Sequence, residues 1–439
     1  MHRRQLVLGW LLALLAVPAL AATNPTRGEN TYKQLELFAR VLSYVENNYV
    51  ENVDEQQLMY GAIRGMLDTL DPHTVFMPPD VFKEMKIDTS GEFGGLGIEI
   101  ARKNDNIVVV APIDDTPAQR AGIKSGDQIL KIDDEATRNM ELAHAIQKMR
   151  GPAGKKVMLV IMREGFSAPR EFAIMRDHIR IASVEGALYG GVGHVKVKNF
   201  QERTDASLFK ELERLRALNG GKELRGLVLD LRNNPGGLLD QAVAISDRFL
   251  PGNLTIVSTR GRAGGHVTEE KSKDRDTERP YPMVVLVNAG SASASEIVAG
   301  ALQDHQRAVV FGVPTFGKGS VQTVIEMEDG SGLKLTIARY YTPRGRSIQE
   351  KGITPDFVVG ESEGQTAAKT EQLREKDLKR HFKGDADADL DTDKLKQNLP
   401  ENLKAWDVTE KLADYQLRIA LTYLNGLTPP GKTTAAKAP

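Results

Sequence analysis

Residues 284–299 read VVLVNAGSASASEIVA and decide the fold. The first four are apolar and rich in valine, which is typical of a strand buried on both faces. Small residues follow, and from Ile297 the pattern is that of a buried helix. Ser293 lies at this strand-to-helix corner, where helix N–H groups point outward and the positive end of the dipole can stabilise an oxyanion. The stretch therefore offers good geometry for a nucleophile at a helix N-terminus.

The same serine also has a purely structural interpretation. Ser293 and Glu296 have the spacing of a capping box, in which the serine only caps the helix. Because capping serines are common, this segment taken alone favours the cap over the nucleophile.

Strands and helices alternate around this corner. The expected strands are 192–197, 226–231, 283–288, 308–312 and 333–341, and the expected helices are 206–217, 238–249 and 295–303. Such alternation predicts an α/β domain with a largely buried sheet.

A candidate base for Ser293 lies downstream, in the glycine-lined turn 317–322, which reads GKGSVQ. Burial of Lys318 in this turn would lower its pKa, so that the neutral amine can act as a general base. Gln322, four residues further on, could orient that amine.

Two segments upstream of the α/β region have patterns of their own. Apolar residues recur at helical spacing between residues 31 and 70, which predicts a small helical module. Residues 91–97 read GEFGGLG. Glycines just before a strand free backbone N–H groups to hold an anion such as a peptide carboxylate.

The second of these segments resembles a PDZ domain over about residues 88–165. Gly94, Gly95, Leu96 and Gly97 stand where that family has its carboxylate-binding loop, and residues 121–130, AGIKSGDQIL, resemble its next most recognisable segment. The resemblance implies that these four residues and Ile98 bind a peptide. The strand edge at Ile98 would pair with the C-terminal end of a protein.

Together these segments resemble the carboxyl-terminal processing peptidases, also called tail-specific proteases, from about residue 35 to residue 360. The resemblance implies that Ser293 is the nucleophile, Lys318 the general base and Gln322 the residue that positions the lysine. It also implies a multidomain α/β protein: a peptidase core like those of crotonases and Clp proteases, an inserted PDZ domain, and helical N- and C-terminal segments.

Residues 230–237, DLRNNPGG, match the glycine turn of this family. The resemblance implies that Gly236 and Gly237 form the oxyanion hole together with the amide of Ala294. It further implies that the PDZ domain recruits the substrate's C-terminus and gates the site. Arg150 is a candidate for coupling the two, and a surface arginine before a turn is the alternative.

Composition indicates the class of protein and its compartment. A chain of 439 residues with 41% hydrophobic and 27% charged residues is typical of a soluble protein with two or three domains. The net charge of -1 provides no attraction to nucleic acid, and we expect no such partner. Residues 1–22 have the charge, apolar run and small residues of a signal peptide. With no cysteine in the chain, the bacterial periplasm fits best.

Rival catalytic pairs are less convincing. If the helix after Ser293 continues to His305, the rise of about 1.5 Å per residue separates the two by about 18 Å. Spacing alone leaves open a more distant histidine, His194 or His266. The spacing of Ser207 and Lys210 is Ser-x-x-Lys, but no Lys-Thr-Gly follows.

Cofactor motifs are incomplete. Residues 312–318 match the start of a P-loop, but Gly319 stands where Ser or Thr should bind magnesium. The alternating aspartates 385–389 lack the glycine and the closing glutamate of a calcium loop. The eight histidines form no His-Glu-x-x-His motif. We therefore expect neither a metal nor a cofactor.

These expectations combine into one hypothesis, a periplasmic serine endopeptidase that recognises substrate C-termini through its PDZ domain and cleaves through an acyl-enzyme. The expected partners are proteins or peptides with exposed C-termini, further copies of this chain, and an activating adaptor protein. The alternative is a non-catalytic PDZ scaffold, or a partner-dependent adaptor, on a degenerate peptidase core.

The expected domains are a signal peptide (1–22), an N-terminal helical region (23–86), the PDZ domain (87–166), the Ser-Lys peptidase core (167–360), a charged C-terminal helical region (361–428) and a disordered tail (429–439).

Overall fold

The computed structural model describes residues 27–262, 267–273, 276–363, 372–384 and 412–427. The chain divides into two units, Met1–Ile63 and Arg64–Pro439. The expected signal peptide and C-terminal tail lie outside the described residues. None of the helices in the described ranges is both long and apolar enough to cross a membrane.

The N-terminal helical module is confirmed by two helices, α1 (Arg27–Asn48) and α2 (Glu55–Leu67). The apolar side chains of α1 are exposed rather than packed, with Leu35 at 57%, Phe38 at 40% and Val41 at 54%. After α2 the chain forms β1 (Val75–Met77) and α3 (Pro79–Ser90).

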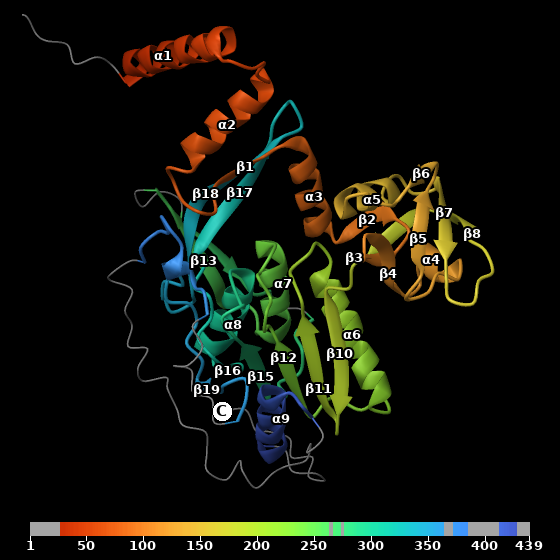
Figure 1. Cartoon of the computed structure of the whole chain (residues 1–439). Coiled ribbons are helices and arrows are strands. Elements are labelled where there is room, and N and C mark those ends of the chain that lie inside the picture. Colours follow the sequence, from red (N-terminus) through yellow and green to blue (C-terminus); the bar gives the residue numbers. More distant parts are fainter. Residues whose placement is uncertain (1–26, 263–266, 274–275, 364–371, 385–411, 428–439) are drawn as a thin grey trace, which may run out of the picture. The chain divides into compact units, whose positions relative to one another are not determined.

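A small sheet with the strand order β3-β4-β5-β7-β8 forms the PDZ-like module (Figure 1). Its elements are β2 (Glu92–Gly95), β3 (Ile98–Lys103), β4 (Asn106–Pro112), α4 (Pro117–Arg120), β5 (Gln128–Ile132), β6 (Glu135–Ala136), α5 (Leu142–Met149), β7 (Lys156–Met162) and β8 (Arg170–Met175). The predicted boundary at residue 166 is wrong, because β8 pairs with β7 along its whole length and buries Ile174 in the module's core. The next strand, β9 (Asp177–Arg180), pairs with β2.

The predicted α/β domain is confirmed by a six-stranded sheet of order β10-β11-β12-β15-β16-β19. All its neighbouring strands are parallel except the β10–β11 pair. The four residues from Val284 to Val287 are fully buried, as their apolar run predicts. The strands are β10 (Val184–Tyr189), β11 (Val192–Val197), β12 (Gly226–Asp230), β15 (Met283–Val287), β16 (Val309–Gly312) and β19 (Phe357–Val358).

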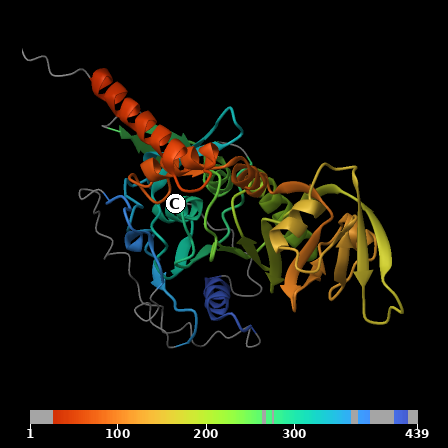
Figure 2. The same ribbon diagram turned by 45° about the horizontal axis from the view of Figure 1, so that its top comes forward.

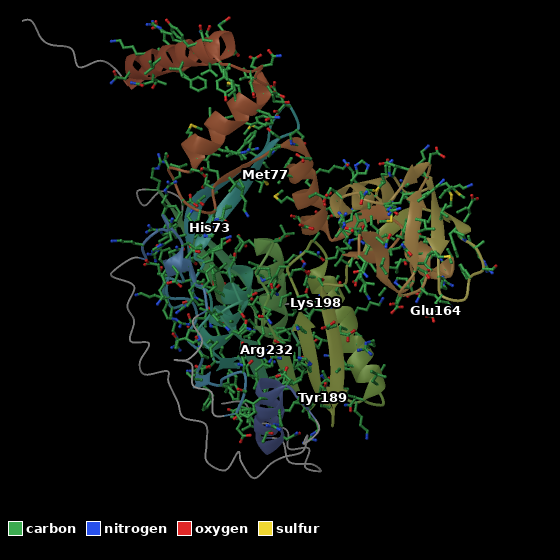
Figure 3. All side chains as sticks on the ribbon, viewed as in Figure 1. His73, Met77, Glu164, Tyr189, Lys198 and Arg232 are labelled. Carbon is green, nitrogen blue, oxygen red and sulfur yellow. The ribbon has the colours of Figure 1, made fainter. Side chains whose placement is uncertain are left out.

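Helices cover both faces of this sheet, as Figures 1 and 2 show. One face packs on α6 (Thr204–Leu218), α7 (Leu239–Phe249) and α8 (Ala294–Asp304). The opposite face packs on α9 (Tyr415–Leu427), which lies in the expected C-terminal helical region (361–428). Residues 412–414 are not helical, and residues 407–411 lie outside the described ranges. Arg232, labelled in Figure 3, follows β12 and holds Asp414 by two hydrogen bonds of 2.9 and 2.6 Å.

A second sheet has the order β1-β18-β13-β14, with β17 on the other side of β18. Its remaining strands are β13 (Thr255–Gly261), β14 (Val267–Lys271), β17 (Ser320–Glu326) and β18 (Gly332–Tyr341). Only β18 was expected from the sequence. Strands β14 and β17 are partly or wholly exposed and β13 buries only Ile256 and Val257, so no long buried apolar run marks them.

Candidate active site

Three loops meet at one edge of the six-stranded sheet. They follow β12, β15 and β16, which are neighbouring parallel strands, so their carboxyl ends lie together. The first loop carries the glycine turn 233–237, the second carries Ser293 and the third carries Lys318. The topology therefore brings together segments that are far apart in the sequence.

Ser293 caps α8, but in a conformation that an ordinary cap does not use. Its φ is 53° and its ψ is -112°, whereas capping residues usually have extended backbone. A non-glycine residue held at such a positive φ stores strain, and strained positions of this kind cluster at active sites. A sharp, strained turn between a strand and a helix is also how some hydrolases present a nucleophilic serine. Ser293 therefore caps α8 in a strained conformation that is also compatible with a nucleophile, so the two interpretations of the sequence do not exclude each other.

The glycine turn packs directly against Ser293. A Cβ atom at Gly236 would lie 2.9 Å from the Cβ of Ser293 and 3.1 Å from the nitrogen of Ala294, so any side chain there would crowd the nucleophile. The amide of Gly236 already donates to Asn234 Oδ1 at 2.9 Å, which corrects its predicted role as an oxyanion donor. The amides of Gly237 and Ala294 donate to no acceptor within the described ranges. These two amides are therefore the available donors.

Asn234 positions this turn and was missed by the sequence. The residue is completely buried. Its backbone carbonyl accepts hydrogen bonds from the amide of Ala292 and the hydroxyl of Ser295, both at the start of α8. Its side chain holds Gly236 on one side and donates to the carbonyl of Val197 on the other. Asn234 thereby fixes the distance between the glycine turn and the nucleophile.

Glu296 joins the segment of Ser293 to that of Lys318, and the sequence indicated only its capping spacing. Its Oε2 accepts hydrogen bonds from the amide of Ser293 at 2.8 Å and from the amide of Lys318 at 2.9 Å. The backbone nitrogens of the two residues are therefore bridged by a single oxygen atom. Its Oε1 accepts the amide of Gly317 at 2.7 Å and the hydroxyl of Thr315 at 2.5 Å. Burial raises the pKa of Glu296 to about 7 despite these four donors.

Lys318 is electrostatically suited to act as a base. Burial lowers its pKa to about 8, and the positive charge of Lys334 acts in the same direction. Glu375, Glu296 and Asp71 oppose this shift. Within the described ranges, the Nζ of Lys318 forms no hydrogen bond, including none to Ser293. Catalytic hydrogen bonds are often long in free enzymes and shorten when substrate binds.

Gln322, which was predicted to position the lysine, bonds other residues in the structure. Its Nε2 donates to the hydroxyl of Ser320 at 2.9 Å and to that of Thr336 at 3.3 Å. No hydrogen bond joins it to Lys318 in the part of the chain that the structure describes. Its predicted contact with the lysine is therefore absent here, and its side chain instead links the start of β17 to β18.

Charged groups near Lys318 come from segments that are far apart in the sequence. His73 Nε2 contacts both carboxylate oxygens of the buried Glu375, at 2.9 and 2.8 Å. Glu375 also accepts from Gln349 at 3.0 Å, and its amide bonds to the carbonyl of Phe316 beside the lysine. The sequence indicated only a turn at His73. Pairing across such a separation leaves no local pattern.

The histidines that could rival Lys318 are engaged elsewhere. His305 Nε2 lies 2.7 Å from the carbonyl of Thr255, and His194 Nε2 lies 3.1 Å from Asp230. His266 lies outside the described residues. None of the other described histidines is hydrogen-bonded to Ser293 either. No group of three or more His, Asp or Glu side chains in the described ranges is arranged to hold a metal ion.

The predicted peptide groove lies in the PDZ-like module. Strand β3 is at the edge of its sheet, so the edge at Ile98 is open, as predicted. A cavity of about 250 Å³ follows this edge. Its walls are Phe93, Gly95, Leu96, Gly97, Ile98, Glu99, Ile100, Ile146, Met149 and Arg150. Gly94 does not line this cavity but borders a larger one, of about 1040 Å³, on the side of α3.

Arg150 stands between these two cavities and borders both. Its guanidinium lies over the ring of Phe93, 4.7 Å from the centroid, and forms an ion pair with Glu84 of α3. It is therefore more than a surface arginine before a turn. Its described partners connect the PDZ-like module to α3 and do not include the catalytic residues.

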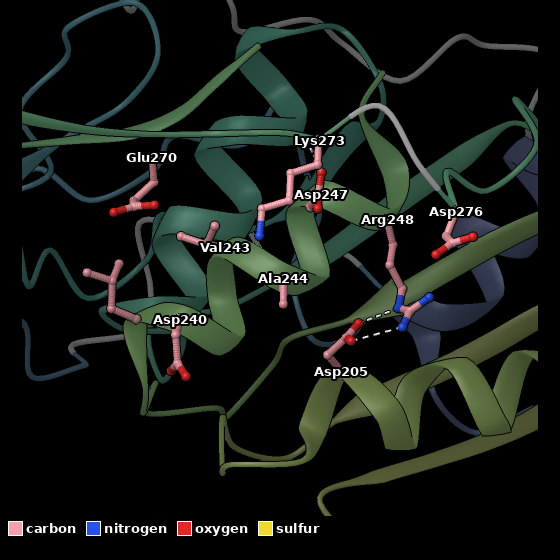
Figure 4. Close-up of a pocket in the computed structure, with 10 residues that line it drawn as sticks. Asp205, Asp240, Val243, Ala244, Asp247, Arg248, Glu270, Lys273 and Asp276 are labelled. Atoms are coloured by element: carbon pink, nitrogen blue, oxygen red, sulfur yellow. Dashed lines mark hydrogen bonds and ion pairs between the residues drawn. The ribbon is translucent and has the colours of Figure 1, made fainter. Parts of the chain in front are cut away.

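A further cavity, of about 460 Å³, lies along α7 (Figure 4). Acidic side chains dominate its walls, and Asp205 and Arg248 are ion-paired on one side. It contains none of the predicted site residues, so it is separate from the active site.

Comparisons with known proteins identify the families that the sequence matches. The family described as Peptidase family S41 matches residues 191–359, the PDZ domain matches residues 84–162, and the activating protease CtpB N-terminal domain matches residues 17–81. A carboxy-terminal-processing protease of Bartonella bacilliformis is 45% identical over 87% of this chain and 87% of its own. The carboxy-terminal processing protease CtpB of Bacillus subtilis is 36% identical over 78% of this chain and 71% of its own.

Solved structures of related proteins are also similar. The photosystem II D1 C-terminal processing protease is 31% identical, with 75% of this chain and 88% of that chain covered and a TM-score of 0.43. A PDZ domain of a carboxy-terminal protease from Vibrio cholerae, solved with a peptide, is 26% identical over 20% of this chain and 99% of its own, with a TM-score of 0.20. By its sequence relatives, the chain belongs to the carboxy-terminal processing proteases, PDZ-containing serine peptidases of family S41.

Proposed function

We propose that this protein is a periplasmic endopeptidase in which Ser293 and Lys318 cleave proteins recognised by their C-termini. The observation that carries the proposal is the strained conformation of Ser293, held beside the segment of Lys318 by Glu296. A serine that served only as a cap would have no need of that strain. A non-catalytic PDZ scaffold would likewise have no need of a desolvated lysine at the same place.

In the proposed reaction, the neutral amine of Lys318 takes the proton of the Ser293 hydroxyl, and the Oγ of Ser293 attacks the peptide carbonyl. The amides of Gly237 and Ala294 stabilise the negative charge on the carbonyl oxygen. The lysine then gives its proton to the leaving amine, and an acyl-enzyme remains on Ser293. Water, activated by the same lysine, hydrolyses this ester and restores the enzyme.

Substrate recognition is assigned to the PDZ groove. A C-terminal segment would pair with the open edge of β3, and its carboxylate would lie at the glycine loop 94–97. Arg150 is at the side of this groove, so it can respond to a bound peptide and pass the change to α3 through Glu84.

The compartment and the assembly are also part of the proposal. The signal-like residues 1–22 support a periplasmic location. The exposed apolar stripe of α1, formed by Leu35, Phe38 and Val41, supports contacts between copies of the chain. An adaptor protein that activates the enzyme would need an exposed surface as well, and the same stripe is available for it.

The first prediction concerns the catalytic pair. Ser293→Ala and Lys318→Ala should each lower kcat on an unfolded protein substrate by about 1000-fold or more, because either change removes a group that acts in the transition state. Cleavage is measured by electrophoresis and mass spectrometry. The matched control is the Ser-x-x-Lys pair of α6, and Ser207→Ala with Lys210→Ala should leave the rate unchanged. Cleavage that survives both catalytic substitutions would refute the assignment.

The second prediction concerns pH. Since Lys318 must be neutral to accept a proton and its pKa is about 8, kcat/KM should rise about tenfold per pH unit below 8 and level off above it. Lys334→Met removes a neighbouring positive charge, so it should raise the pKa of Lys318 and move this limb to higher pH by up to about one unit. A limb that stays in place or moves to lower pH would contradict this role of the lysine.

The third prediction concerns the substrate's C-terminus. Amidation of the terminal carboxylate should lower kcat/KM by about tenfold or more, because the glycine loop would lose a charged hydrogen-bond acceptor. Acetylation of the same peptide's N-terminus serves as the control and should change nothing. Equal rates for the free acid and the amide would show that the carboxylate is not recognised.

The fourth prediction concerns assembly. The substitutions Leu35→Asp, Phe38→Asp and Val41→Asp, made together, should reduce the mass seen in analytical ultracentrifugation, because charges would replace an apolar contact. Glu36→Ala with Arg40→Ala removes an ion pair on the same helix and should leave the mass unchanged. If the mass is the same for all three proteins, α1 does not carry the assembly.

A further inference from the structure

Strand β17 has a partner on one side only. It pairs with β18, and no other strand in the described ranges pairs with it. It begins at Ser320, two residues after Lys318, and runs away from the active site to Glu326. An unpaired edge of this kind presents a row of free N–H and C=O groups that can bind another strand.

The register shows which backbone groups of β17 are free. The amide of Tyr340 donates to the carbonyl of Gly319, so Val321 two residues on also faces β18. The register then shifts by one residue on β18, beyond Val321. Past this bulge the amide of Thr336 points away from β17, toward Thr74. Alternation therefore turns Thr323 and Ile325 toward β18.

The backbone groups of the intervening residues, Gln322, Val324 and Glu326, face the open edge. No hydrogen bond to these groups is formed by any other part of the chain that the structure describes. The edge thus offers donors and acceptors at every second residue, which is the spacing of a neighbouring strand.

Side chains around this edge are apolar and exposed. Val324 and Ile325, on opposite faces of β17, are 43% and 42% exposed, and Ile337 at the bulge of β18 is 50% exposed. At the far end, the ammonium of Lys86 pairs with Glu326 at 2.8 Å and ties the strand to α3. Natural sheets usually protect an open edge with charges or proline, whereas here the middle of the strand carries neither.

We propose that the open edge of β17 binds an extended segment of the substrate as an added strand and guides it to Ser293. This inference rests on the proposed peptidase function. It adds that the enzyme recognises the extended backbone of the substrate near the active site. Main-chain hydrogen bonds to Gln322 and Val324 recognise an extended, unpaired backbone, and the exposed valine and isoleucine side chains favour apolar neighbours. A folded segment, whose backbone groups are already bonded, is excluded.

The position of Gln322 makes this edge part of the catalytic site. Its side chain bonds Ser320 and Thr336, while its backbone belongs to the open edge. A strand added at this residue would therefore pair with the chain four residues beyond Lys318, on the strand that continues directly from the lysine loop.

An amide-to-ester scan of a cleavable peptide tests the proposal with the unaltered enzyme. Each ester removes one N–H, so esters near the scissile bond should lower kcat/KM by about 2- to 10-fold at every second position and have little effect between them. The last five residues stay unchanged, so that the PDZ groove does not contribute to the pattern. Equal effects at successive positions, or none, would overturn the added strand.

A variant of β17 provides the second test. Val324→Pro removes one N–H from the open edge and no bond to β18, and edge strands tolerate proline. It should lower kcat/KM for the extended peptide by about 2- to 10-fold, whereas Val324→Ile, which keeps both the N–H and an apolar side chain, should lower it less. Labelling of Ser293 by a small fluorophosphonate should proceed equally in both variants. Equal kcat/KM in both, with labelling intact, would overturn the proposal.

Binding measured without cleavage separates this inference from the proposed function. The same ester series is titrated against the Ser293→Ala protein and followed by fluorescence anisotropy. Alternating losses of affinity with no cleavage by the unaltered protein would reject the peptidase and keep the strand-binding edge. Cleavage without alternation in either measurement would keep the peptidase and reject the edge.

Discussion

A single buried carboxylate holds together the two segments that carry Ser293 and Lys318, the proposed catalytic residues. Glu296 accepts four hydrogen bonds, and they come from both the nucleophile corner and the lysine loop. A carboxylate with four donors around it cannot lose any one of them cheaply, because a buried unpaired acceptor or donor costs about 1–3 kcal/mol. The relative position of Ser293 and Lys318 is therefore determined by hydrogen-bond geometry rather than by packing alone.

Glu296 also affects the protonation of Lys318, in addition to holding its loop in place. With a pKa of about 7 it is ionised at the pH where Lys318, with a pKa of about 8, becomes neutral. Burial and the charge of Lys334 lower the pKa of Lys318, and the negative charge of Glu296 opposes this shift. The lysine retains a pKa close to the working range of a general base, which suits proton transfer in both directions.

Much of the fold was accessible from sequence because it depends on local patterns. The buried strands β11, β12, β15 and β16 and the helices α6 to α8 follow apolar runs and 3.6-residue periodicity. The strands β13, β14 and β17 were missed because their residues are partly exposed and their pairing partners are distant in the chain. The end of the PDZ-like module was misplaced for the same reason, since only pairing with β7 identifies β8.

The candidate site divides in a similar way. The glycines and the helix start marked Ser293 and Lys318 as candidates, but the local pattern alone favoured a cap for Ser293, and their pairing was predicted from the resemblance to the peptidase family. The amide of Gly236, the missing contact of Gln322, and the roles of Asn234 and Glu296 depend on hydrogen bonds between loops, which no sequence pattern records. Two pairings between distant residues, His73 with Glu375 and Arg150 with Glu84, likewise became evident only in three dimensions.

Residues far along the chain support the loop that carries Lys318. Arg374 donates to the carbonyl of Thr315, the amide of Glu375 bonds Phe316, and α9 covers one face of the central sheet. These contacts come from residues made late in synthesis. The lysine loop is therefore supported by residues that lie well after it in the sequence, and a chain shortened before Arg374 would have its serine corner without that support.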